Sequence, residues 1–242
     1  MRAGTWNLEW AARGPAERER QADVLAALRP DVWVLTEARA DVLPQGRASA
    51  SSEPIPLDRK DGGCFAVVGA PHLEPVDVPN LPTGAGGVVT THGERWLVLG
   101  VCMPWRNNAP PLPPGAAPGA VDGPTQWLSV LASLDLALQR LSGLVAPGRV
   151  LLAGDLNQNL SGKPVGFKGG RDLLAGVLGR HGLLAYTAQE PSLLAQYGSV
   201  DHVCGPAVPA EVERWPDEAA GLSDHLGYVA RIDLNCSVGR TG

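Results

Sequence analysis

Polar side chains that can bind metal ions or move protons fall near the ends of strand-like segments of this chain. Buried strands read as runs of apolar residues, so a carboxylate, amide or imidazole at such an end stands out. The residues are Asn7 and Glu9, Glu37, Asp155 and Asn157, Asp201 and His202, and Asp224 and His225. Carboxylate and amide oxygens without thiolates favour Mg²⁺ or Mn²⁺. This set fits the metal-assisted hydrolysis of a phosphate ester.

Most of these residues also have a purely structural interpretation. Asn7 and Glu9 could be ordinary polar residues of an edge strand. Glu37 could cap the element that follows it, and the polar residues that begin at Asp155 could form an Asx turn. Each structural interpretation explains only one or two residues. The case for a catalytic site therefore depends on the fold bringing all of these residues together.

The apolar segment 198–205 is harder to explain structurally, because Asp201 and His202 interrupt it. Burying a polar group without a partner costs about 1–3 kcal/mol. Neighbouring residues of a strand point to opposite faces, so we expect Asp201 to point inward and His202 outward. Asp201 is therefore the residue that a purely structural interpretation fits least.

Strand-like and helix-like segments would position these residues. Strands are expected over 4–10, 31–37, 64–70, 86–93, 95–105, 149–159, 198–205 and 227–234. Helices are expected over 14–30, 124–143 and 169–183. Many strands with few, long helices favour two sheets packed face to face with the helices outside. The strand ends could then share one edge of the paired sheets.

Length and composition are those of one globular domain that spans 1–242. Hydrophobic residues make up 44% of the 242 residues and charged residues 19%, which suits a sizeable core. Residues 106–125 are rich in Pro, Gly and Ala and are expected to form a long surface loop. Residues 235–242 are expected to be a frayed tail.

Charge and cysteine content narrow the class of protein. The net charge of −5 argues against a strongly basic nucleic-acid coat but allows a local basic patch. No segment approaches the roughly 20 apolar residues of a membrane span, and the N-terminus lacks the apolar run of a signal peptide. The 4 cysteines form no Cys-x-x-Cys pair, which favours buried thiols over a zinc cluster. We therefore expect a cytoplasmic monomer with no membrane span.

Five short motifs follow one another along nearly the whole chain: W-N-L-E, L-T-E, G-D-L-N, V-D-H and S-D-H. In this order and at these spacings they resemble the endonuclease/exonuclease/phosphatase superfamily, which includes pancreatic DNase, AP endonucleases and neutral sphingomyelinases. The resemblance implies an α/β fold, a four-layer α/β/β/α sandwich of two packed mixed sheets with helices outside. It also implies a phosphoesterase that depends on Mg²⁺ or Mn²⁺, with the site at one edge of the sheets.

The resemblance implies a metal-binding group near the start of the chain. Glu37 matches the metal-binding glutamate of the family, and Asn7 matches an asparagine near the metal and the phosphate. Glu9 falls where AP endonucleases carry an aspartate that helps to hold the ion. Asp224 matches a further possible metal ligand.

The resemblance also implies a catalytic group. Asp155 matches the aspartate that orients or deprotonates the attacking water, and Asn157 the amide that grips a phosphoryl oxygen. Asp201 matches the carboxylate paired with the terminal histidine, which is His225 here. A carboxylate behind an imidazole fixes its tautomer and supports its cationic form.

One position departs from the family pattern. Cys102 stands where the family often has a Tyr or His that points at the phosphate. A thiol is a weak hydrogen-bond donor and does not replace a phenol or an imidazole. Either a neighbour such as Arg106 supplies this contact, or the activity is slower or altered.

Two segments are candidates for substrate contact. The first follows G-D-L-N and carries Lys163, Lys168 and Arg171 on a Gly-rich loop that could lie along phosphates. The second includes Arg106 and Asn107. Both could equally be solvated loops. Because the fold does not choose the substrate, we expect nucleic acid first, a small or lipid phosphate ester second, and a catalytically weak binding protein third.

Overall fold

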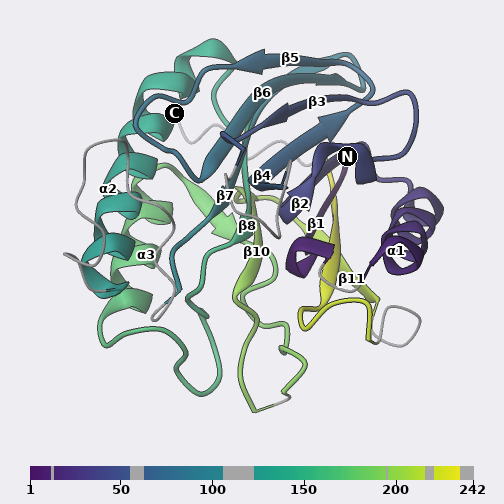
Figure 1. Cartoon of the computed structure of the whole chain (residues 1–242). Helices are drawn as coiled ribbons and strands as arrows, with labels where there is room; N and C mark the ends of the chain where they lie inside the picture. Colours follow the sequence, from purple (N-terminus) through teal and green to yellow (C-terminus); the bar gives the residue numbers. More distant parts are fainter. Residues whose placement is uncertain (12–13, 55–62, 106–122, 195, 216–220, 235–242) are drawn as a thin grey trace.

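The computed structural model describes residues 1–11, 14–54, 63–105, 123–194, 196–215 and 221–234 (Figure 1). Two six-stranded sheets form the centre of this structure. The first has the order β11-β12-β1-β2-β4-β3 and the second the order β5-β6-β7-β8-β10-β9. Both sheets are mixed, because β1 pairs parallel with β2 and β7 pairs parallel with β8, whereas the other pairs are antiparallel.

The strands of each sheet come from distant parts of the chain. The first sheet holds β1 (Arg2–Asn7), β2 (Val32–Arg39), β3 (Ala48–Ser51), β4 (Gly63–Ala70), β11 (Ala210–Trp215) and β12 (Gly227–Ile232). The second holds β5 (Leu73–Val76), β6 (Gly84–Thr91), β7 (Glu94–Cys102), β8 (Val150–Asp155), β9 (Leu183–Ala185) and β10 (Asp201–Pro206). Among the described strands, β12, the last in sequence, thus returns to pair with β1, the first.

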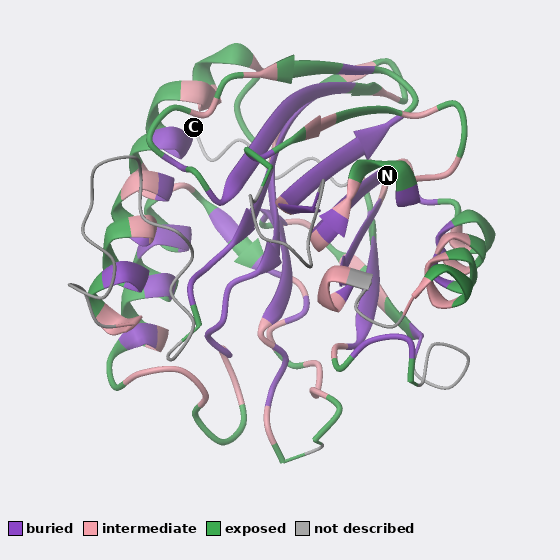
Figure 2. Cartoon of the chain, viewed as in Figure 1, coloured by how far each residue is buried: buried purple, intermediate pink, exposed green. Residues whose placement is uncertain are grey.

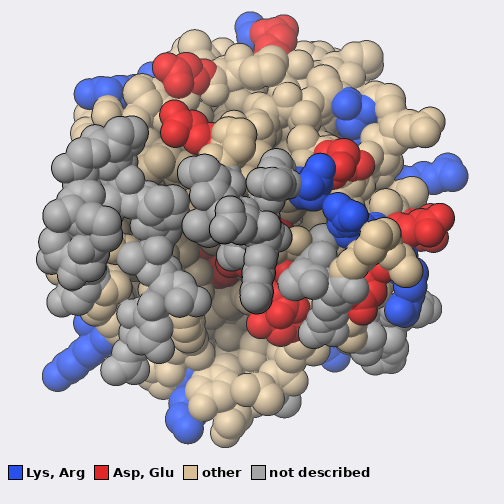
Figure 3. Space-filling view, in the orientation of Figure 1, with Lys and Arg blue, Asp and Glu red and all other residues tan. Residues whose placement is uncertain are grey.

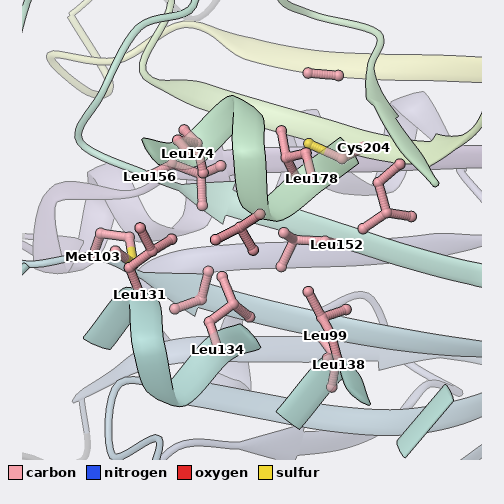
Figure 4. Close-up of a cluster of buried hydrophobic side chains, with 14 of the residues drawn as sticks. Leu99, Met103, Leu131, Leu134, Leu138, Leu152, Leu156, Leu174, Leu178 and Cys204 are labelled. Carbon is pink, nitrogen blue, oxygen red and sulfur yellow. The ribbon is translucent and has the colours of Figure 1, made fainter. Parts of the chain in front are cut away.

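The sheets pack face to face, and helices cover their outer faces. Small and β-branched residues such as Val34, Val98 and Val203 fill the interface between the sheets. Helix α1 (Pro15–Leu28) packs on the first sheet through Leu25, and α2 (Gly123–Leu141) and α3 (Gly170–Arg180) pack on the second. Figure 4 shows the leucines and the sulfur-containing residues of this outer layer, and Figure 2 shows the buried strands between exposed helix faces. The expected four-layer α/β/β/α sandwich is confirmed.

The described residues also include short 3₁₀ helices, η1 (Glu9–Ala11), η2 (Ala40–Val42) and η3 (Ser142–Leu144). The first of them corrects a prediction, because the opening strand ends at Asn7 rather than at residue 10 and Glu9 lies in η1. A left-handed backbone at Glu9, with φ of 50°, ends the strand.

Other boundaries differ from the expected ones. Strands β3, β5, β9 and β11 were not expected, and β2 runs two residues beyond Glu37. Helix α2 begins at Gly123, inside the loop expected over 106–125. The remainder of that loop and the expected tail over 235–242 lie outside the described residues. In the part of the chain that the structure describes, no helix is long and apolar enough to cross a membrane.

Candidate active site

The polar residues from the two sheets meet between the inner faces, where β1, β2, β8 and β10 come together. Strand alternation places Asp155 with Ala153, and Asp201 with Val203, on the side that packs against the first sheet. Asp155 and Asp201 are partners across the antiparallel pair of β8 and β10. Asn7 reaches them from β1 and donates from Nδ2 to Asp155 Oδ2 over 3.0 Å. Acidic side chains also gather near the middle of the face seen in Figure 3.

Asp155 is the buried centre of this group, with 2% of its surface exposed. Gly154 directs it there, because its φ is 129° and a Cβ would lie 2.1 Å from the Val101 carbonyl oxygen. Burial raises the pKa of Asp155 to about 7, and the negative charges of Asp201 and Glu37 add to this shift. The charge of His225 and the backbone N–H of Asn157 oppose the rise in pKa only in part. Asp155 therefore lies where a carboxylate can accept a proton near neutral pH.

Two asparagine amides hold Asp155 in place. Asn157 donates its backbone N–H to Asp155 Oδ1 over 2.9 Å and its Nδ2 to Oδ2 over 3.2 Å. The same Nδ2 donates to the Met103 carbonyl oxygen over 2.7 Å. Asn157 has a left-handed φ of 49°, which asparagine tolerates better than most residues. The donors of Asn7 and Asn157 are thus directed at Asp155, and the expected grip of Asn157 on a phosphoryl oxygen stays a prediction.

Asp201 and His225 form a close pair. His225 Nδ1 lies 2.6 Å from Asp201 Oδ2, and the side chain of His225 is 20% exposed. Burial alone would lower the pKa of His225, but the charge and hydrogen bond of Asp201, with Asp155 and Asp224, raise it to about 10. The imidazole is therefore cationic at neutral pH. Asp201 is fixed in turn by Ser199, whose hydroxyl accepts the Asp201 backbone N–H over 3.0 Å.

The loop before β12 is tied to β1. The Ser223 hydroxyl donates to the Asn7 carbonyl oxygen over 2.6 Å and accepts the backbone N–H of His225 over 3.0 Å. Trp6 Nε1 donates to the His225 carbonyl oxygen over 3.2 Å. Ser223 thus positions His225 relative to Asn7, a role that the expectation for S-D-H did not include. Asp224 is exposed, and its Oδ1 lies 3.7 Å from His225 Nε2.

Glu37 reaches the site through a break in strand alternation. Its φ is 48°, and the next residue, Ala38, packs in the same outer cluster as Leu35. The break turns the backbone so that Glu37 comes close enough to raise the pKa of Asp155. A left-handed glutamate inside a strand is a strained conformation of the kind that accumulates at functional sites. Glu9 follows Asn7 by two residues in sequence, and its backbone N–H donates to Asn7 Oδ1 over 2.9 Å.

The donor set fits a divalent cation. Among the described residues, Asp155, Asp201 and His225 have candidate ligand atoms that all lie within 4.8 Å of one another. His225 as a cation has no free lone pair for a metal, which leaves the two carboxylates as the donors. Asp201 Oδ1 is buried and has no hydrogen-bond partner in this part of the chain. A buried carboxylate oxygen without a donor and a carboxylate whose pKa is raised by its neighbours both mark negative charge that a cation would neutralise. Oxygen donors of this kind suit Mg²⁺ and Mn²⁺. Of the expected ligands, Glu9, Glu37 and Asp224 are not members of this close group.

Cys102 lies on the inner face beside the site. It is the register partner of Asp155 across the parallel pair of β7 and β8. The thiol is buried, and its Sγ lies 4.0 Å from the Met103 carbonyl oxygen. Arg106 and Asn107, which were expected to contact the substrate, lie outside the described residues.

The loop between β8 and α3 carries exposed lysines, and hydrogen bonds from Arg171 hold its backbone. Lys163 and Lys168 are exposed, and Lys163 Nζ lies 5.3 Å from the centre of the Tyr197 ring. Arg171 donates to the carbonyl oxygens of residues 159, 161 and 162 and to Asn159 Oδ1. These contacts give Arg171 a structural role in the loop, and its expected role toward substrate stays a prediction.

His202 points outward, as expected. It lies on the opposite face of the strand from Asp201, and it is fully buried there. The reason is that loops and helices cover that face of the second sheet as well. His202 Nε2 lies 3.1 Å from the Gln158 carbonyl oxygen, and its Nδ1 lies 3.1 Å from Thr187 Oγ1. No sequence signal marked Thr187 or Gln158, since a single polar residue of either type is common in loops and at strand ends.

Solved structures of several proteins share this fold. The endonuclease domain of TRAS1, a telomere-specific non-LTR retrotransposon, superposes with a TM-score of 0.63 and 18% identity, covering 96% of this chain and 98% of that one. D. rerio TDP2 complexed with single strand DNA product gives 0.59 and 15%, covering 95% and 97%. Sphingomyelinase C from Streptomyces griseocarneus gives 0.56 and 16%, covering 96% and 99%.

At these identities the likeness establishes the fold alone. No curated protein sequence matches the chain significantly. A family model, however, matches residues 4–225, from within β1 to the histidine of the Asp201–His225 pair. Every residue of the candidate site described above lies inside that match. The chain therefore belongs to the endonuclease/exonuclease/phosphatase family.

Proposed function

We propose that the chain is a Mg²⁺- or Mn²⁺-dependent phosphoester hydrolase whose first substrate is a phosphodiester of nucleic acid. The observation that carries the proposal is the arrangement of Asp155 and the Asp201–His225 pair, a proton acceptor and a cationic imidazole at one point between two sheets. The enzymes after which the family is named all act on phosphoester bonds.

Asp155 is the residue that prepares the attacking water. Its carboxylate accepts the proton of a water as the water oxygen bonds to phosphorus, and the burial that raises the pKa of Asp155 favours this uptake of a proton. Asn7 and Asn157 keep the carboxylate from rotating, because each donates a hydrogen bond to it. Fixing the base before the reaction removes much of the orientational cost of the step.

His225 acts on the phosphoryl oxygens and on the leaving group. Its cation stabilises the charge that builds on the phosphoryl oxygens, and its Nε2 proton goes to the leaving oxygen as the phosphorus–oxygen bond breaks. Asp201 holds Nδ1 and supports the cation, as in other aspartate–histidine pairs. The proton that Asp155 gains and the proton that His225 gives keep the overall hydrolysis balanced.

The proposed metal ligands are Glu37, Asn7, Glu9 and Asp224, and of these Asn7 is hydrogen-bonded to Asp155. A bound divalent cation would supply electrophilic stabilisation of the phosphate oxygens. Glu37 supports this role because it already acts electrostatically on Asp155.

Two features favour nucleic acid as the substrate. Lys163 and Lys168 are exposed on the loop that follows Asp155 and Asn157, where they can contact a phosphate backbone. Two proteins with the same fold are a retrotransposon endonuclease and a TDP2 bound to a DNA product. The net charge of −5 means that such contacts would have to be local.

A lipid phosphodiester is the alternative that a specific observation favours. Leu193 and Leu194 are 49% and 64% exposed on the loop that leads into β10 and Asp201. Apolar side chains exposed in this way can enter a lipid interface. One protein of the same fold is a sphingomyelinase.

An activity panel tests the proposal. The purified chain is incubated with Mg²⁺, Mn²⁺ or EDTA and with plasmid, abasic duplex, single-stranded DNA, RNA, chromogenic phosphate esters and sphingomyelin vesicles. We expect metal-dependent cleavage of nucleic acid, and a loss of about 10³-fold in kcat/KM in Asp155→Asn, because the base is removed while the shape is kept.

The matched control is Asp77→Asn, which alters an exposed carboxylate on the loop after β5 and should leave the rate unchanged. Equal, metal-independent turnover in wild type and Asp155→Asn on every substrate would refute the enzyme proposal. Cleavage of vesicles or small esters with no cleavage of nucleic acid would refute the nuclease proposal and support the alternative.

A further inference from the structure

His202 lies directly behind the candidate site and takes no part in the proposed chemistry. We propose that it is a positioning residue: it holds the carbonyl of Gln158, the residue after Asn157, and so keeps Asn157 against the Asp155 carboxylate. The proposed effect on turnover rests on the proposed function. The proposed effect on the backbone does not.

The contacts of His202 define a directed chain of hydrogen bonds. The Gln158 carbonyl oxygen can only accept, so His202 Nε2 carries the proton and donates over 3.1 Å. The neutral ring then accepts at Nδ1 from the Thr187 hydroxyl over 3.1 Å, the shorter of the two contacts open to that one proton, since the Asp201 carbonyl oxygen lies 3.3 Å away. Thr187 Oγ1 accepts in turn the backbone N–H of Val203 over 3.2 Å. Burial lowers the pKa of His202 to about 4, which keeps the ring in this neutral form.

Gln158 is held at both of its ends. Its side-chain Oε1 packs so closely against Gly166 and Gly170 that a Cβ at either glycine would lie 2.3 Å from it. Its Nε2 donates to the Val165 carbonyl oxygen. His202 then fixes the backbone carbonyl. The residue directly after Asn157 therefore has little freedom to rotate.

This restraint matters because Asn157 has a left-handed backbone. Its φ of 49° persists only where the surroundings over-determine it. Both Asn157 contacts with Asp155, through the backbone N–H and through Nδ2, depend on that conformation. If the carbonyl of Gln158 lost its donor, the Gln158–Asn159 peptide could turn toward another one. The left-handed backbone of Asn157 next to it would then be free to relax, and the Asn157 N–H would leave Asp155. His202 thus acts on the proposed base through the backbone, without touching it.

The alternative is that His202 is only a packed core residue. The two interpretations differ in what a conservative replacement restores. His202→Leu removes the donor to Gln158 and the acceptor for Thr187 while filling similar space. His202→Gln places an amide that can donate to Gln158 and accept from Thr187. Thr187→Val removes the hydroxyl at the other end of the chain and serves if His202→Leu does not fold.

Amide hydrogen exchange over residues 155–159 is the readout that needs no substrate. We expect exchange at Asn157 and Gln158 to be at least about 10-fold faster in His202→Leu, and to return close to the wild-type rate in His202→Gln. Thr187→Val should give a smaller increase at the same two positions. Exchange in β4 and β6, remote from these contacts, serves as the internal control.

Kinetics provide the second readout. We expect kcat to fall about 10- to 100-fold in His202→Leu with KM within about threefold of wild type, because the base is displaced while substrate contacts remain. His202→Gln should recover most of kcat. Unchanged exchange at 155–159 in both His202→Leu and Thr187→Val, or no recovery in His202→Gln, would overturn the proposal. If wild type cleaves no substrate, the proposed function fails, and the exchange result alone decides the role of His202.

Discussion

Two aspartate–histidine pairs in this chain have the same separation and opposite surroundings. His225 Nδ1 lies 2.6 Å from Asp201 Oδ2, and His181 Nε2 lies 2.6 Å from Asp135 Oδ1. The imidazoles are similarly covered, with side chains 20% and 16% exposed. The carboxylates differ, because that of Asp201 is 4% exposed and that of Asp135 is 31% exposed. Separation alone therefore does not distinguish a candidate catalytic pair from a surface contact.

The charges around each pair make the difference. Asp135 on α2 also contacts Arg180, which ends α3, over 2.7 Å, so its negative charge is met by a guanidinium in addition to the His181 ring. Burial alone would raise the pKa of Asp135, but Arg180 and His181 outweigh it and lower that pKa. Around His225 the excess is negative, since Asp155 and Asp224 join Asp201. The first pair is a clamp between two helices, and the second is a cation held among carboxylates.

Removing each imidazole in turn should give the largest difference between the two pairs. His225→Ala should lower kcat/KM about 10³-fold, because the donor to the leaving oxygen and the cation beside the phosphate are both lost. His181→Ala should leave kcat/KM within about twofold, because the clamp lies on the helices that cover the second sheet. Both rates are measured on the best substrate of the activity panel. Equal losses in the two variants would contradict the assignment of His225.

Replacing each aspartate should give a smaller contrast. Asp201→Asn keeps the shape but withdraws the charge that supports the His225 cation, and we expect kcat to fall about 10²-fold with little change in KM. Asp135→Asn should leave kcat unchanged and lower the free energy of unfolding by about 1 kcal/mol or less, as for an exposed ion pair. Steady-state kinetics and urea unfolding measure the two effects. A loss of kcat in Asp135→Asn as large as that in Asp201→Asn would contradict the proposal that only the Asp201–His225 pair supports catalysis.

The sequence predicted the strands that carry a strong apolar signal and missed the ones that do not. Strands such as β2 and β7 are near-continuous apolar runs, which identify them in any context. Strand β3 reads Ala-Ser-Ala-Ser, and β11 alternates with charged residues on an exposed edge. Their strand conformation comes from pairing with β4 and β12, which no local pattern encodes.

Some features of the candidate site could likewise be predicted from the sequence, and others could not. The order of the motifs selected Asp155, Asp201 and His225, which the structure brings within 4.8 Å of one another. The positive φ of Glu37 and the cover over His202 could not be anticipated from residue type. Both depend on contacts between segments far apart in sequence. His202 and Gln158 are 44 residues apart, and strand alternation could say only which face His202 points to.

The two pairs should also respond to pH in opposite directions, and this is the smallest of the expected effects. The pKa of His225 is raised from 6.5 to about 10, so its stabilisation is complete below about pH 6.5 and is lost as the pH rises toward 10. The pKa of Asp135 is lowered from 3.8, so its stabilisation is present above that value and is lost as the pH falls below it.

Two neutral double variants separate these contributions in EDTA-containing buffer. The Tm advantage of wild type over Asp201→Asn/His225→Gln should shrink between about pH 7 and pH 10, by a few degrees, since a shift of this size is worth about 1–3 kcal/mol after screening. The advantage over Asp135→Asn/His181→Gln should shrink only below about pH 4, and by less, because Asp135 is partly exposed. If both advantages shrank at the same end of the pH range, the two pairs would have the same electrostatic character. The carboxylates that surround His225 would then not be what sets its charge state.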